Sequence, residues 1–193
     1  MKNLTKLLES KKTVFITEDW VKIFWNNNLN YIRLIFHRLK NSWGLKEAKK
    51  WVWVLTKHNS WKLSNSLLNH SYISLETILY KHNFIFQTYI DTITAVSKRK
   101  LEIEFEDKSY QYKRFINRIV DNSIGIEDED IDWEIVRVAS KERAICDWIH
   151  MTWKIYFDNI TRKMISLKKM DEIKHIYPNK TVLKINKFIN DIE

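Results

Sequence analysis

A cysteine and a histidine stand at a spacing that could bind a metal ion. Cys146 and His150 are four residues apart on a predicted helix, which would place both side chains on one face. Cys146 is the chain's single cysteine, and no His-Glu-x-x-His pair accompanies it. The sequence therefore offers half of a zinc site, and a small core residue is the better interpretation of Cys146.

Carboxylates alternate along one predicted strand. Glu102, Glu104 and Glu106 alternate with apolar residues, and Asp91 belongs to a neighbouring predicted strand. Strand carboxylates of this kind could serve a metal-dependent nuclease, but the outward face of a half-exposed strand shows the same pattern. We keep the nuclease as the least favoured alternative. The acidic run 127–130 with Asp132 lacks the glycine of a calcium loop and indicates a solvated loop.

Nucleic-acid recognition is the chemistry that residues 26–40 favour. Apolar residues recur there at helical spacing and leave a basic, amide-rich face. Arginine and asparagine can pair bidentately with guanine and adenine edges, so we expect Asn30 and Arg33 to contact bases. The other candidates for DNA contact in this segment are Asn28, Tyr31, His37, Arg38 and Lys40.

The flanking sequence supplies the elements that would present this face. Residues 17–24 form an amphipathic helix, with Thr17 as its expected N-cap, and three asparagines then mark a turn. Two helices joined by a polar turn predict a helix-turn-helix. Residues 45–55 predict a β-hairpin, or wing, whose phosphate-binding candidates are Lys46, Lys49 and Lys50.

The charge distribution agrees with this interpretation. Residues 1–58 carry twelve basic and four acidic side chains, so they hold most of the net charge of +9. A one-sided positive charge suits a module that binds a polyanion, because neutralised phosphates release counterions. The alternative, in which the basic residues only aid solubility, stays open.

The fold class that we predict is α+β. A winged helix-turn-helix domain over residues 1–58 precedes a mixed α/β domain over residues 59–193 that ends in helices. No apolar run is long enough to span a bilayer, no signal-peptide core follows Met1, and a lone cysteine suits a reducing compartment. We therefore expect a cytoplasmic protein that is not an enzyme and has no cofactor or metal.

Three segments carry a resemblance to a known family. They are Tyr72–Asn83, in which Ser74 is the expected N-cap of a helix, Ala139–Asp147, in which Ser140 is the expected N-cap of a helix that starts with Glu142-Arg143-Ala144, and the predicted wing from Gly44 to Leu55. In these segments the chain resembles the AbiEi family of abortive-infection antitoxins and related winged-helix regulators. The family's motif positions would be Ser74, Glu76, His82, Glu142, Arg143 and Asp147.

The resemblance implies a function that spacing alone does not give. It implies a winged-helix repressor of its own operon, whose second domain counters a partner nucleotidyltransferase toxin. An antitoxin or adaptor that binds proteins without reading DNA is the alternative. The chain departs from the family where Trp51 and Asn83 replace customary glycines. A tryptophan with positive φ would be strained, whereas asparagine tolerates that conformation.

Overall fold

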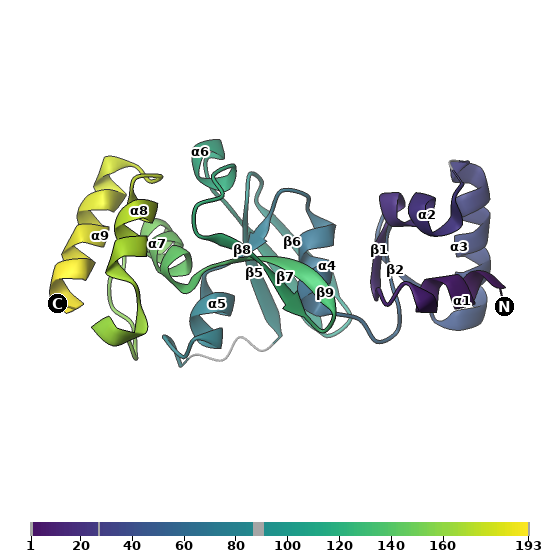
Figure 1. Ribbon diagram of the computed structural model, residues 1–193, viewed down its shortest axis with the longest axis horizontal. Helices are drawn as coiled ribbons and strands as arrows, with labels where there is room; N and C mark the ends of the chain where they lie inside the picture. Colours follow the sequence, from purple (N-terminus) through teal and green to yellow (C-terminus); the bar gives the residue numbers. More distant parts are fainter. Residues whose placement is uncertain (1, 27, 87–90, 193) are drawn as a thin grey trace. The chain divides into compact units, whose positions relative to one another are not determined.

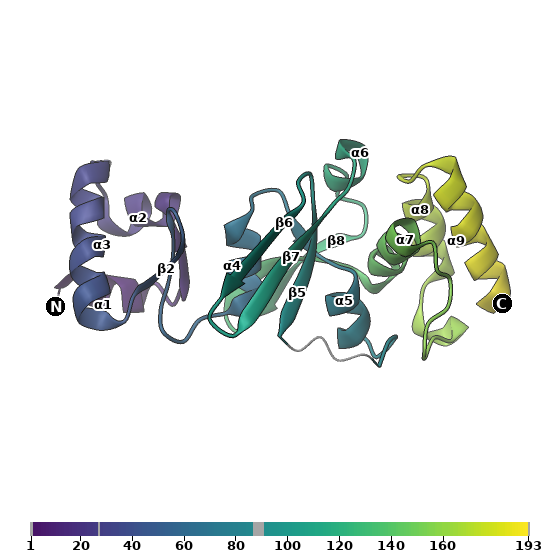
Figure 2. The ribbon, with the colours of Figure 1, turned by 180° about the vertical axis from the view of Figure 1, so that it is seen from behind.

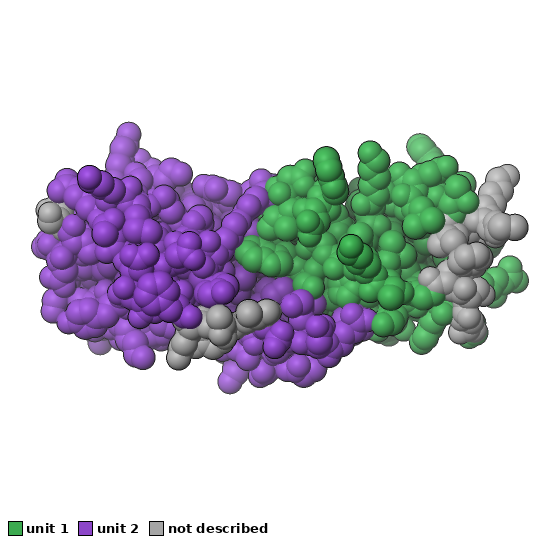
Figure 3. Space-filling model, turned by 90° about the horizontal axis from the view of Figure 1, so that it is seen from below, with its two compact units in different colours: residues 1–69, 130–136 green, residues 70–129, 137–193 purple. Residues whose placement is uncertain are grey.

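The computed structural model describes residues 2–26, 28–86 and 91–192 (Figure 1). The chain is α+β, and its strands form two sheets. Figure 3 colours two compact units, residues 1–69 with 130–136 and residues 70–129 with 137–193. Residues 59–69 and 130–136, which the sequence analysis places in the second domain, thus group with the first unit.

The first unit combines four helices with a three-stranded antiparallel sheet of order β1-β3-β2, counted over the described residues. Its elements along the chain are α1 (Lys2–Glu9), β1 (Val14–Ile16), α2 (Thr17–Phe24), α3 (Leu29–Trp43), β2 (Lys46–Lys49), β3 (Val52–Val54) and α4 (Ser60–Leu67). The predicted helix pair and hairpin therefore form at the expected places.

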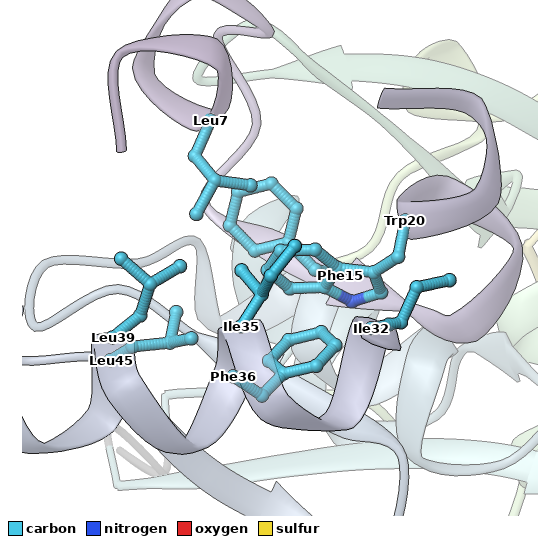
Figure 4. Packing of buried hydrophobic residues seen from close by; sticks show 8 residues of the cluster. All are labelled: Leu7, Phe15, Trp20, Ile32, Ile35, Phe36, Leu39 and Leu45. Carbon is cyan, nitrogen blue, oxygen red and sulfur yellow. The ribbon is translucent and has the colours of Figure 1, made fainter. Parts of the chain in front are cut away.

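One aromatic and aliphatic core holds these elements together (Figure 4). Trp20 from α2 is fully buried against the rings of Phe15 from β1 and Phe36 from α3. The other cluster members are Leu7, Ile32, Ile35, Leu39 and Leu45. Four of the eight come from α3 at the helical spacing that the sequence shows, which confirms the predicted buried stripe.

The second unit contains most of a mixed sheet of order β6-β7-β5-β4-β9-β8, of which residues 130–136, at the β8–β9 turn, belong to the first unit. Its strands are β4 (Tyr72–Ile73), β5 (Thr92–Ser97), β6 (Leu101–Phe105), β7 (Lys108–Arg114), β8 (Ile126–Ile131) and β9 (Glu134–Ala139). The β5–β7 and β4–β9 pairs are parallel, whereas β4–β5 and β6–β7 are antiparallel. Figure 2 shows β6 at one edge of this sheet.

The helices of the second unit pack on one another and, through the first of them, on the sheet. They are α5 (Glu76–Lys81), α6 (Asn117–Val120), α7 (Lys141–Thr152), α8 (Leu167–Lys174) and α9 (Asn179–Ile192), with a 3₁₀ turn at Arg162–Met164. α5 packs on β5 and on α7, and α7 also contacts α8 and α9. The predicted cap of α7 is confirmed, because the Ser140 hydroxyl accepts the Arg143 N–H at 3.2 Å.

Two other predicted helix caps are wrong. The N-cap residues of α2 and α5 are Ile16 and Leu75, not Thr17 and Ser74. At α2 the Ile16 N–H donates to the Asp19 carboxylate at 3.1 Å, so a side chain from inside the helix satisfies it. At α5 the Ser74 hydroxyl donates to Asp147 instead, at 2.7 Å.

Trp51 and Asn83, which stand where the resembled family customarily has glycine, both have left-handed backbone. The φ angle is +72° at Trp51 and +59° at Asn83. The strand predicted beside Glu102–Glu106, over residues 88–96, corresponds to β5; Asp91 precedes β5, and residues 88–90 lie outside the described part of the chain. Among the helices described, none is both long and apolar enough to cross a membrane.

Candidate nucleic-acid interface

The outer face of α3 carries the side chains that the sequence singles out. At about 100° per residue, Asn30, Leu34 and His37 form the middle of the exposed face, opposite the buried stripe. Arg33 and Lys40 lie along one edge of it. Tyr31 and Arg38 lie along the other, and all seven side chains are exposed. The helix therefore presents three cations, an amide and an imidazole to solvent.

Asn28 has a structural task at the start of this helix. Its side chain accepts the backbone N–H groups of Asn30 and Tyr31 at 3.0 and 3.2 Å, as an N-cap does. Because its side-chain oxygen already accepts these two N–H groups, we assign Asn28 the role of positioning α3. The dipole of α3 also makes this end of the helix favourable for an anion.

Arg33 is held at the edge nearest the β2–β3 hairpin. Its Nη1 donates to the side-chain Oδ1 of Asn30 at 3.2 Å, and its guanidinium lies 4.6 Å from the centre of the Trp51 ring. From the buried stripe of α3, Phe36 stacks on Trp53 with ring centres 4.6 Å apart. Two aromatic contacts thus join α3 to the hairpin, and the predicted base-reading pair, Asn30 and Arg33, is already hydrogen-bonded together.

The three hairpin lysines occupy different environments. Lys46, Lys49 and Lys50 are all exposed. The Lys49 ammonium donates to the Leu67 carbonyl at 2.8 Å, so α4 restrains it. Lys50 stands in the turn, 6.0 Å from the Trp51 ring centre. Lys50 is therefore better placed than Lys49 to contact a phosphate.

Three of the residues that the resemblance names, Ser74, Arg143 and Asp147, lie in the core of the second unit. Arg143 and Asp147 have no exposed surface, and Arg143 Nε lies 3.4 Å from Asp147 Oδ1 in an i,i+4 ion pair. Ser74 donates to Asp147 Oδ2 at 2.7 Å, and the Tyr177 hydroxyl donates to Oδ1 at 2.5 Å. Tyr72 bridges the pair, since its hydroxyl donates to Asp147 Oδ1 at 3.3 Å and accepts from Arg143 Nη2 at 3.1 Å. We call these five residues the buried polar cluster.

Arg143 also ties the cluster to the chain around it. Its Nη1 donates to the Ile124 carbonyl at 2.8 Å and its Nη2 to the Ile119 carbonyl at 2.7 Å. Burial lowers the pKa of the guanidinium, but Asp147, Tyr177 and Tyr72 together raise it by more, so the net shift is upward and Arg143 stays charged. Burial, then Asp147, raises the pKa of Tyr72, and burial does the same for Tyr177. This arrangement satisfies buried charges rather than exposing them to a substrate.

The remaining motif residues are half-buried or buried. The Glu142 carboxylate accepts the Ser166 N–H at 2.9 Å and so fastens the start of α8 to α7. Glu76 lies in the first turn of α5 and is half-buried. His82 ends α5, and burial, then Lys81 and Lys141, lowers its pKa. The contacts described for these three residues do not indicate a catalytic role.

The candidates for metal chemistry do not assemble. In the described residues, no three His, Cys, Asp or Glu side chains come close enough to hold a metal ion. Glu102 and Glu104 are exposed on β6, and Glu106 lies in the following turn. Cys146 is fully buried, which raises the pKa of its thiol. The His150 Nδ1 pairs with Thr181 Oγ1 at 2.8 Å, and burial lowers the pKa of that histidine.

Three positions that matter to these arrangements were not singled out from the sequence. Tyr72 and Tyr177 complete the buried polar cluster, although they are about a hundred residues apart. Glu134 accepts the Thr13 and Val14 N–H groups at 3.2 and 3.4 Å. Each partner is distant in sequence, so no local pattern could reveal the pairing.

Comparison with known proteins adds no family to this description. No protein-family model matches the chain, and a search of curated proteins finds no match.

Proposed function

We propose that this chain is a sequence-specific DNA-binding repressor whose first unit is a winged helix-turn-helix. In this proposal α2 and α3 form the helix-turn-helix, α3 enters the major groove, and the β2–β3 hairpin is the wing. One observation carries it: the exposed face of α3 groups Asn30 and Arg33 with basic side chains beside a lysine-bearing hairpin. Arginine and asparagine read base edges, and lysines hold phosphates.

The charge of the first 58 residues supports the same proposal. Twelve basic and four acidic side chains supply the field that draws DNA to this unit. A protein-binding adaptor would need no such excess. A nuclease has less support, because the described carboxylates on and near β6 do not converge with other metal ligands.

An antitoxin role for the second unit is the other part of the proposal. It rests on the AbiEi resemblance and on the convergence of its two motif segments, since Ser74 from one meets Arg143 and Asp147 from the other in the buried polar cluster. The proposed partner is a nucleotidyltransferase toxin. Growth rescue by the full chain, when both are co-expressed, tests this role separately from DNA binding.

The decisive experiment is binding of the purified chain to DNA from upstream of its own gene, against scrambled DNA, over a salt series. Arg33→Ala should weaken specific binding by about 1–3 kcal/mol and relax specificity. Arg114→Ala, at an exposed position on β7 in the second unit, is the matched control and should leave binding unchanged. Equal affinity for both DNAs, indifferent to Arg33→Ala, would contradict the proposal.

A further inference from the structure

Leu34 is the one apolar side chain in the middle of the exposed α3 face, as far as that face is described. It is 47% exposed and lies one turn from both Asn30 and His37, which are also exposed. A helix normally turns leucine inward, and a single outward leucine on a soluble protein is common. The position of this leucine gives it significance, because its neighbours are the side chains proposed to read bases.

The major groove offers one apolar feature, the C5-methyl group of thymine. We propose that Leu34 contacts a thymine methyl and is a specificity-determining residue of this chain. This inference rests on the proposed DNA-binding function. An asparagine one turn earlier can pair with adenine, so Asn30 and Leu34 together would select A·T pairs at neighbouring positions of the DNA site.

Replacing thymine by deoxyuridine removes only that methyl group, and it allows a double-mutant cycle. The wild-type chain should bind the deoxyuridine form of its upstream site several-fold more weakly, about fourfold for each contacted methyl. Leu34→Ala should bind the thymine site more weakly than the wild type by a similar factor. On the deoxyuridine site the variant and the wild type should have the same affinity, because the methyl contact is already missing there. Alanine keeps the helix propensity of this exposed site. Leu183→Ala, at an exposed leucine of α9, is the control.

The outcomes separate the two proposals. If the wild-type chain does not select its upstream DNA at all, the proposed function fails. If it selects that DNA but is indifferent to the methyl groups, or if Leu34→Ala is as sensitive to them as the wild type, the Leu34 contact is overturned while the function stands.

A second inference is carried by the backbone and is independent of DNA binding. Four tryptophans have left-handed backbone: φ is +51° at Trp25, +72° at Trp51, +65° at Trp133 and +60° at Trp153. In the described residues ten non-glycine positions have positive φ, and these tryptophans are four of them. A bulky residue in this region is an outlier that needs a cause.

Each of the four stands where folds ordinarily use glycine. Trp25 and Trp153 are the left-handed C-caps of α2 and α7. Trp51 is the second residue of the two-residue turn between β2 and β3. Asp132 and Trp133 form the two-residue turn between β8 and β9, and both have positive φ, as in the hairpin turn that prefers Asp-Gly.

Side-chain packing does not account for Trp25 and Trp133. Trp25 is 91% exposed and Trp133 is 86% exposed, so no core compensates for their backbone strain. Trp20 is the contrast, because its ring is buried among aromatic neighbours and its φ is not positive. The whole chain has nine tryptophans and only two glycines, and both glycines also have positive φ.

We infer that Trp25, Trp51, Trp133 and Trp153 are glycine positions of this fold, encoded by the codon UGA. Some genetic codes read UGA as tryptophan, whereas others read it as glycine. In a host of the second kind, the ribosome would place glycine at all four positions. Trp20 would be encoded by UGG and remain tryptophan in either case. The face of α3 would be unchanged, apart from the loss of the Trp51 ring beside Arg33.

Peptide mass spectrometry of the chain from its own host tests this directly. The expected result is glycine at position 133, with tryptophan at position 20 as the internal control. Tryptophan at position 133, or a UGG codon there, would overturn the inference. An independent check is stability: Trp133→Gly should raise the unfolding midpoint by relieving the left-handed backbone, and a lowered midpoint would contradict a glycine position.

Discussion

The two units place their most informative charged residues in opposite environments. In the first unit Arg33, Arg38 and Lys40 are exposed on one helix face. In the second unit Arg143 and Asp147 have no exposed surface. Both sets belong to helices with ordinary amphipathic patterns, so residue type does not separate them. The surroundings of the two sets differ. The first set faces solvent, whereas the second set forms hydrogen bonds with backbone carbonyls and tyrosine hydroxyls.

This difference indicates what each set contributes. Exposed cations add little to folding stability but attract and position an anionic partner. A buried ion pair contributes through the cost of breaking it, because a lone charge would remain in the core. We therefore expect substitutions to separate cleanly, with binding lost in the first unit and stability lost in the second.

The largest effect should come from breaking the buried polar cluster. Arg143→Ala would leave the Asp147 carboxylate unpaired and two backbone carbonyls without their donor, at a cost of about 3–5 kcal/mol. Urea unfolding, with amide exchange in α7 to locate the loss, measures it. Arg114→Ala, at an exposed site in the same unit, should change the unfolding free energy by less than about 0.5 kcal/mol. Similar results for the two variants would remove the distinction between the units.

An alkaline transition should follow from the same cluster. Burial raises the pKa of Tyr72 and Tyr177 above their ordinary value of 10.0, so the fold favours the neutral hydroxyls. Their contribution to stability is complete below pH 10 and is lost as the pH rises above it. Tyr177→Phe should cost stability at neutral pH and make the alkaline loss shallower. An unchanged pH profile between pH 9 and 12 would show that Tyr177 does not titrate with unfolding.

The smallest effect compares two neighbouring hairpin lysines. Lys50→Ala should lower the slope of log affinity against log salt by about one, because one phosphate contact is lost. Lys49→Ala should lower it less, since α4 already holds that ammonium through the Leu67 carbonyl. Folding stability should hardly change in either variant. A larger slope change for Lys49 would place the DNA against the opposite side of the hairpin.

Local pattern was sufficient for most of the elements. The stripe from Ile32 to Leu39 predicts α3, and strict alternation predicts β6, because helix and strand periods are backbone properties that show in sequence. The caps were less predictable. Ser140 caps α7 as expected, but Ser74 does not cap α5, because a carboxylate from another helix takes its hydroxyl.

The candidate interface could be drawn from the sequence, but its internal contacts could not. Spacing on one helix is enough to group Asn30, Arg33 and His37 on an outer face. The pairing of Arg33 with the hairpin turn required the turn's position in space. In the second unit the resemblance named Arg143 and Asp147 but assigned them no environment, and Tyr72 and Tyr177 went unnoticed.

By itself, the sequence determined the α+β class, the positions of most helices and strands, and the concentration of positive charge in the first 58 residues. These follow from periodicity and composition, which act over a few residues. Only the tertiary structure decided which charged side chains face water and which are buried in a hydrogen-bonded cluster. That choice depends on contacts between segments up to about a hundred residues apart, such as Tyr72 with Tyr177 through Asp147, and chain folding alone brings them together.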